Sequence, residues 1–125
     1  MNHILLVGAG GALGSVLRYL VGLWMLQRAG PAFPWGTLFV NVTGSFLIGF
    51  LAEFIMHKMG ASPEMRVFLI TGVLGGYTTF SAFSLDAIAL LEHGQTMSGL
   101  AYIVASVGLS ILAVFAGLAL MRAMV

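Results

Sequence analysis

Charged residues are scarce in this chain. Lysine and arginine together number five, aspartate and glutamate four, and they make up 7% of the 125 residues. A soluble domain carries about 25% charged residues. With 60% hydrophobic residues and so little charge, the chain must have membrane lipid as its main solvent. The formal net charge of +1 leaves no basic field, so we expect no nucleic-acid partner.

Cysteine is absent, which excludes a disulfide scaffold, a thiol nucleophile and a thiolate metal site. The histidines, His3, His57 and His93, lie too far apart in sequence for metal-ligand spacing. The acids Glu53 and Asp86 adjoin no histidine or serine in a pattern typical of a nucleophile and its base, and their roles stay open. We therefore expect no enzyme activity.

Long apolar runs, in contrast, are abundant. A spanning helix needs about 20 mostly apolar residues, and such runs cover residues 4–26, 35–56, 67–91 and 98–121. The prediction is an all-α membrane protein with a single transmembrane domain over residues 1–125. Four packed helices fill their own middle. A transport path would therefore have to lie at a subunit interface, and we expect an oligomer.

The basic residues near the span ends give only a weak orientation signal. With four spans, the termini share one side with Lys58, Arg66 and Arg122, while the other side carries Arg28, and Arg18 if it reaches that end. So small a bias permits both orientations in the membrane, and with them an antiparallel dimer.

The first span combines closely spaced glycines with a cation. Its start looks like a nucleotide-binding glycine loop, but Leu13 replaces the third glycine and no acidic residue follows at the required distance. Gly10 and Gly14 are better interpreted as a small-xxx-small pair for close helix packing. Arg18 is costly inside an apolar span. Two interpretations stay open: an interfacial anchor beside Tyr19, or an anion-attracting group at a vestibule mouth.

Asn41 places a side-chain amide within the second span. Such a group needs a partner, so it either bonds a neighbouring helix or lines a pore as a donor. Thr37 lies four residues earlier on the same helical face, and we include it among the predicted pore residues.

The third span carries the strongest signal, in residues 71–84. Three glycines and the pair Thr78–Thr79 predict a break near its middle, although a glycine-rich packing face is an alternative. Broken backbone inside a membrane is tolerated where it is buried or lines a cavity, and its free carbonyls can coordinate a cation. Phe80 and Phe83 follow directly on one face. They are either aromatics that face lipid or the core, or rings whose positive edges attract an anion along a path.

A polar stripe runs along the fourth span. Tyr102, Ser106 and Ser110 follow one another at intervals of four residues on an otherwise apolar helix. Three hydroxyls in line indicate either a hydrated track or a helix interface.

With these motifs, the chain resembles the Fluc (CrcB) family of fluoride channels over essentially its whole length. The resemblance rests on residues 14–19 (Gly-Ser-Val-Leu-Arg-Tyr), 35–41 (Trp-Gly-Thr-Leu-Phe-Val-Asn) and, most specifically, 71–84. It implies an antiparallel, dual-topology homodimer in the inner (cytoplasmic) membrane, with two pores for passive fluoride export. No other protein partner is implied.

The resemblance also implies roles for individual residues. It implies a structural sodium ion at the dimer centre, held by the backbone carbonyls of Gly75 and Thr78. It implies that Asn41, Phe80 and Phe83 lie along the fluoride path and that Tyr102, Ser106 and Ser110 form its polar track. One departure is Val114, where the family's track can continue with a further hydroxyl.

Two other functions remain open from the residues. A small multidrug transporter is also a four-helix antiparallel dimer, but it needs a membrane-buried carboxylate, and the first span here has none. A structural or assembly subunit without transport of its own is the second alternative.

Overall fold

The computed structural model describes residues 2–57 and 62–124, so Lys58 of the predicted charge bias lies outside the described residues. Within these ranges, four helical segments are long and apolar enough to cross a membrane. They are α1 (Asn2–Ala29), α2 (Trp35–His57), the composite segment Pro63–Glu92, and α6 (Thr96–Met124). Each predicted span lies inside one of them, which confirms the all-helical, four-span prediction.

The third segment is a composite of several helices. It consists of α3 (Pro63–Arg66), the π-helix η1 (Val67–Leu74), α4 (Gly75–Tyr77) and α5 (Phe80–Glu92). Between α4 and α5 the backbone is extended, with φ −90° and ψ 160° at Thr78 and φ −153° and ψ 121° at Thr79. The predicted break is therefore confirmed, whereas the π-helical stretch before it was not expected.

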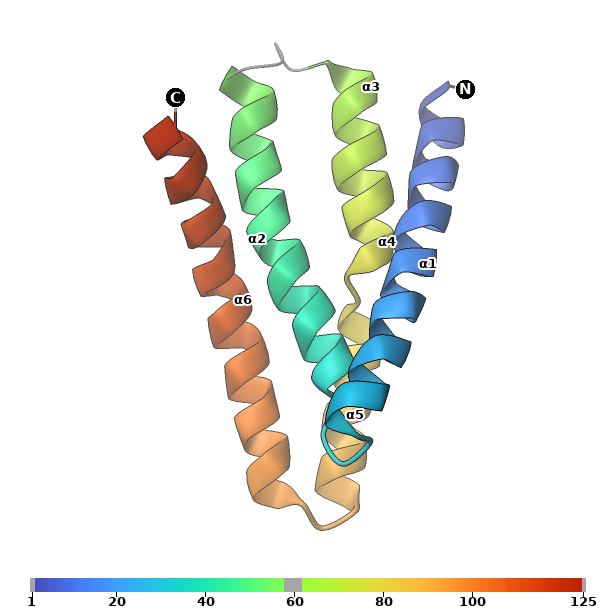
Figure 1. Ribbon diagram of the computed structural model, residues 1–125, viewed down its shortest axis with the longest axis vertical. Coiled ribbons are helices and arrows are strands. Elements are labelled where there is room, and N and C mark those ends of the chain that lie inside the picture. The colour runs from blue at the N-terminus through green and yellow to red at the C-terminus, as the bar shows by residue number, and fades with distance from the viewer. Residues whose placement is uncertain (1, 58–61, 125) are drawn as a thin grey trace.

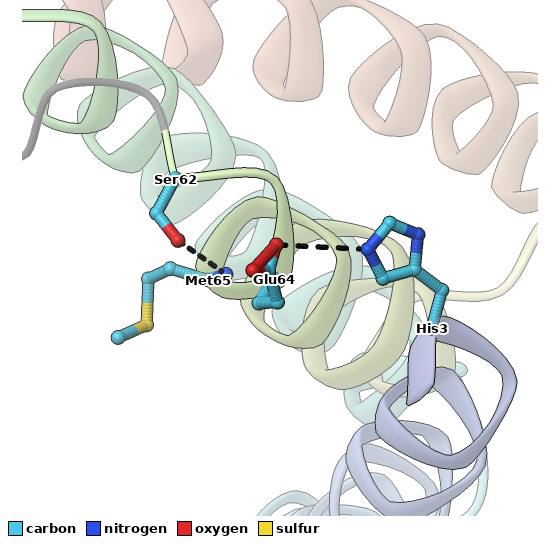
Figure 2. Close-up of polar contacts among 4 residues, drawn as sticks. All are labelled: His3, Ser62, Glu64 and Met65. Atoms are coloured by element: carbon cyan, nitrogen blue, oxygen red, sulfur yellow. Dashed lines mark hydrogen bonds and ion pairs between the residues drawn. The ribbon is translucent and has the colours of Figure 1, made fainter. Parts of the chain in front are cut away.

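The third segment begins with a capped turn. The Ser62 hydroxyl accepts a hydrogen bond from the Met65 amide at 3.4 Å, as Figure 2 shows, and proline follows the cap directly. His3 at the start of α1 lies 3.6 Å from the Glu64 carboxylate. This contact joins the first turns of α1 and α3 at the same end of the molecule.

The helices pack in two groups (Figure 1). α1 runs beside η1 and α4, while α2 runs along α6, and α5 packs against α6 beyond the break. Both termini, the end of α2 and the start of α3 lie at one end of the molecule. The α1–α2 and α5–α6 connections lie toward the other end, as an even number of spans requires.

Glycines allow the helices within each group to approach closely. A Cβ atom on Gly10 would lie 2.6 Å from a backbone carbonyl oxygen of η1, and one on Gly14 would collide with the carbonyl oxygen of Val73. These contacts confirm that Gly10 and Gly14 serve helix packing. Gly49 and Gly117 form a similar contact between α2 and α6, where an added Cβ would also meet backbone.

A charge cluster joins α2 to α6 near the termini. Glu53 is only 6% exposed, and its carboxylate lies 2.8 Å from the His57 ring and 3.2 Å from the Arg122 guanidinium. A buried carboxylate requires such partners. The role of Glu53, open from sequence, is therefore an interhelical ion pair.

Candidate functional site

An open groove lies where the broken third segment meets α2 and α6. Its volume is about 360 Å³, and residues of α2, η1, α4, α5 and α6 line it. The lining includes five predicted pore residues and both predicted sodium ligands: Asn41, Phe80, Phe83, Ser106, Ser110, Gly75 and Thr78. Residues from three different spans therefore converge on one concave surface.

Asn41 holds the break in the third segment. Its Nδ2 donates to the Thr79 carbonyl oxygen at 2.9 Å, and its Oδ1 accepts from the Thr79 amide at 2.8 Å. The side chain therefore replaces the one hydrogen bond that the Thr79 amide would have made in a continuous helix, and it adds a second bond to the Thr79 carbonyl oxygen. A side-chain amide carries two hydrogens, and the bond to Thr79 O uses one of them. Asn41 thus combines both interpretations of the sequence, an interhelical bond and a place on the groove wall.

The break releases the carbonyl groups of Gly75 and Thr78. In a continuous helix, Gly75 O would accept from the Thr79 amide and Thr78 O from the Ala82 amide. The Thr79 amide instead donates to Asn41, and the Ala82 amide donates to Thr79 Oγ1 at 3.1 Å. Both released carbonyls belong to residues of the groove wall. Carbonyl oxygens suit a hard cation, so these two residues fit a sodium site.

Phe80 and Phe83 form a pair that runs from the rim of the groove into the core. Their ring centroids lie 5.5 Å apart, and the Phe83 and Tyr102 centroids lie 5.3 Å apart. Phe80 is 77% exposed, whereas Phe83 is 8% exposed and belongs to the core cluster with Leu38 and Tyr102. Phe83 is therefore anchored by packing, and Phe80 presents its ring at the open side.

Ser106 contributes a hydroxyl without a partner. The residue is 6% exposed, and in the described part of the chain its Oγ is the buried side-chain polar atom that makes no hydrogen bond. Leaving such a group unsatisfied costs about 1–3 kcal/mol. Because Ser106 lines the groove together with Ser110, one turn away, a bound ligand could supply the missing partner.

The remaining predicted pore residues converge on Asp86. Asp86 Oδ2 accepts from the Thr37 hydroxyl at 2.8 Å and from the Tyr102 hydroxyl at 3.2 Å. Thr37 and Asp86 line a second cavity of about 520 Å³ beside the α1–α2 connection, whereas fully buried Tyr102 is among the described lining residues of neither cavity. Sequence reasoning gave Asp86 no role, although an acid inside a span always needs partners.

Arg18 is held at the break. Its Nε donates to the Gly76 carbonyl oxygen at 3.0 Å, and its side chain is half-buried. Arg18 is not among the described lining residues of the two cavities. The structure thus places its guanidinium against α4.

Comparison with known proteins identifies the family of this chain. The sequence profile of the family described as "CrcB-like protein, Camphor Resistance (CrcB)" matches residues 5–118. A Rhizobium meliloti (strain 1021) protein named Fluoride-specific ion channel FluC is 99% identical over the full length of both chains. Proteins of the same name are 65% identical in Rhizobium etli (strain ATCC 51251), over the full length of both chains, and 62% identical in Agrobacterium fabrum (strain C58), over 98% of each. The chain therefore belongs to the CrcB family.

Proposed function

We propose that this multi-pass membrane protein is a fluoride-selective channel, not an enzyme, that exports fluoride passively across the inner (cytoplasmic) membrane. The name shared by its relatives, Fluoride-specific ion channel FluC, supports this function. The groove supports it independently, because neutral donors and phenyl rings gather there inside an apolar bundle. The observation that carries the proposal is that Ser106, whose buried hydroxyl has no hydrogen-bond partner, is one of the residues that line the groove.

The groove offers the chemistry that fluoride needs. Fluoride is small and strongly hydrated, so a path must replace its water with donors while holding the ion weakly enough for release. The groove can supply several neutral donors. They are the second amide hydrogen of Asn41, the hydroxyls of Ser106 and Ser110, and the ring edges of Phe80 and Phe83. Weak, successive sites of this kind favour conduction over tight binding.

The proposed working unit is an antiparallel, dual-topology homodimer with two such pores. A groove with polar walls cannot face lipid without large cost, and Phe80, 77% exposed, marks the side left uncovered by this chain. A second, inverted copy would cover it. The Gly75 and Thr78 carbonyls of two chains would together supply four oxygen ligands to a structural sodium ion at the centre.

Liposomes that contain only this protein test the proposal. We expect rapid fluoride efflux and little chloride efflux, measured with ion-selective electrodes. An assembly subunit would pass no fluoride. A multidrug transporter would instead take up a cationic drug in response to a proton gradient, and either result would contradict the channel.

Replacing Ser106 by alanine is expected to have opposite effects on flux and stability. Without an internal partner for its hydroxyl, Ser106→Ala should leave the melting temperature unchanged or raise it, since a desolvated group worth about 1–3 kcal/mol is removed. Fluoride efflux should fall several-fold. Ser84→Ala is the matched control. The Ser84 hydroxyl donates to the Phe80 carbonyl oxygen, one turn earlier in the same helix, at 3.0 Å, and Ser84 is not among the described residues that line the groove. Unchanged efflux in Ser106→Ala would remove Ser106 from the path.

Isoleucine in place of Phe80 or Phe83 should slow fluoride without unfolding the protein. Each variant keeps an apolar side chain but loses the positive ring edge. Contacts between two aromatic rings are worth about 0.5–1.5 kcal/mol, and we take the same scale for the contact of a ring edge with fluoride. That range corresponds to a decrease in efflux of about two- to tenfold. Phe115→Ile, an exposed position on α6, should change nothing. Fluoride efflux at the wild-type rate in both Phe80→Ile and Phe83→Ile would contradict a role for the ring edges in conduction.

A further inference from the structure

Arg18 lies deep in the membrane-spanning part of α1. It lies eleven positions before Ala29, the end of the helix, which corresponds to about 16 Å along the axis. A cation at this depth needs a partner inside the protein. Its partner is the Gly76 carbonyl oxygen, 3.0 Å from Nε.

The helix packing explains why Arg18 meets this carbonyl. Gly10, Gly14 and Arg18 follow at intervals of four residues, so they share the face of α1 that packs on the third segment. The glycines bring the two backbones together, and a Cβ atom on Gly76 would lie 2.6 Å from Gly11 O. Arg18, one turn beyond Gly14, is thereby placed beside α4.

The neighbouring glycines Gly75 and Gly76 have different surroundings at the break. Gly76 packs on α1, whereas Gly75 lines the groove, and a Cβ atom there would meet nothing closer than Ile70 O at 3.7 Å. In a continuous helix Gly76 O would accept from the Phe80 amide, but Phe80 lies beyond the break. Arg18 supplies a donor in place of that amide.

From these contacts we propose that Arg18 is a positioning residue for the sodium site. By bonding Gly76 O on the α1 side, its Nε–H fixes the rotation of α4 that turns Gly75 toward the groove. Asn41 fixes the other side of the break through Thr79. This inference rests on the proposed function, because it assumes that the Gly75 and Thr78 carbonyls hold the cation.

The hydrogen bond, not the charge, carries this role. A guanidinium near a bound cation repels it, so the charge of Arg18 cannot strengthen sodium binding. Its contribution must come through the position of the Gly76 peptide. Three substitutions separate the hydrogen bond from the charge. Glutamine places a neutral N–H the same number of bonds from Cα as arginine Nε, and methionine places a methyl group at that same distance. Lysine keeps the charge but places its nitrogen one bond further from Cα.

Sodium titration of thermal stability separates these variants. The purified full-length protein is melted in detergent at increasing sodium concentration, with potassium as counter-titrant. Arg18→Met should raise the sodium midpoint by about tenfold, the ratio expected for losing one hydrogen bond with a charged donor. Arg18→Gln should keep the wild-type midpoint or lower it. Arg28→Gln is the control, since Arg28 stacks on Trp24 at the far end of the same helix.

The outcomes separate this inference from the proposed function. A wild-type midpoint in Arg18→Met overturns the inference, as does a raised midpoint or loss of folding in Arg18→Gln. If Arg18→Met does not fold, Arg18→Lys is compared with Arg18→Gln instead. A lower sodium midpoint in Arg18→Lys than in Arg18→Gln would show that the charge of the side chain matters, and it would also overturn the inference. A wild-type protein with no response to sodium removes the cation from the proposed function and this inference with it. Fluoride efflux from wild-type liposomes, measured in parallel, shows whether the channel function itself survives.

Discussion

Asn41→Asp is expected to stop fluoride efflux. An aspartate carboxylate cannot donate to Thr79 O, so one of the two bonds that hold the break is replaced by repulsion between oxygens. An ionised carboxylate on the groove wall also repels fluoride, by about 4 kcal/mol for charges 4 Å apart at an effective dielectric constant of 20. We therefore expect efflux from liposomes to fall by at least about a hundredfold.

Protonation of the new acid would not rescue conduction. A neutral carboxyl group could restore the bond to Thr79 O, but it would have no second hydrogen for fluoride. Asn2→Asp is the matched control, because it is the same chemical change at an exposed position in the first turn of α1. Efflux near the wild-type rate in Asn41→Asp would show that Asn41 does not belong to the path.

Gly14→Ala is expected to prevent stable folding. The added Cβ would collide with the Val73 carbonyl oxygen and lie 2.9 Å from the Tyr77 amide nitrogen. These are backbone atoms next to the break, so no side chain can move away to make room. Overpacking typically costs about 1–3 kcal/mol, and this position should lie at or above the upper limit. The readout is the fraction of protein that stays folded on heating in detergent.

Gly8→Ala is the control on the same helix, since a Cβ atom there would meet nothing within 4 Å. It should melt at the wild-type temperature. If Gly14→Ala also melts there, α1 and the third segment do not pack as closely as the structure shows.

Much of the fold could be predicted from local signals. Lipid exposure requires long apolar helices whose backbone bonds are satisfied internally, so the four spans follow from composition and run length. The break follows from Gly75, Gly76, Thr78 and Thr79, which favour an extended turn in mid-span. Gly10 and Gly14 indicated close packing because small residues at that spacing have few other uses in a membrane.

The partners of the polar groups could not be predicted in this way. Thr37 and Tyr102 both bond Asp86, across 49 and 16 residues of sequence. Arg18 reaches Gly76 across 58 residues. The π-helix of η1 also escaped prediction, because its mostly apolar residues carry no local signal that distinguishes a π-helix from an α-helix, and packing selects the wider turn.

By itself, the sequence determined that the chain lies in lipid and crosses it four times, because both follow from the apolar runs. It also determined where the third span breaks, because the break depends on local backbone preferences. The tertiary structure decided which groups the break engages: Asn41 takes the Thr79 peptide, Arg18 takes Gly76 O, and Ser106 is left without a partner. The physical reason is that a polar group in lipid costs free energy until a partner elsewhere in the fold, or a bound ligand, satisfies it. Its identity depends on how helices distant in sequence pack together.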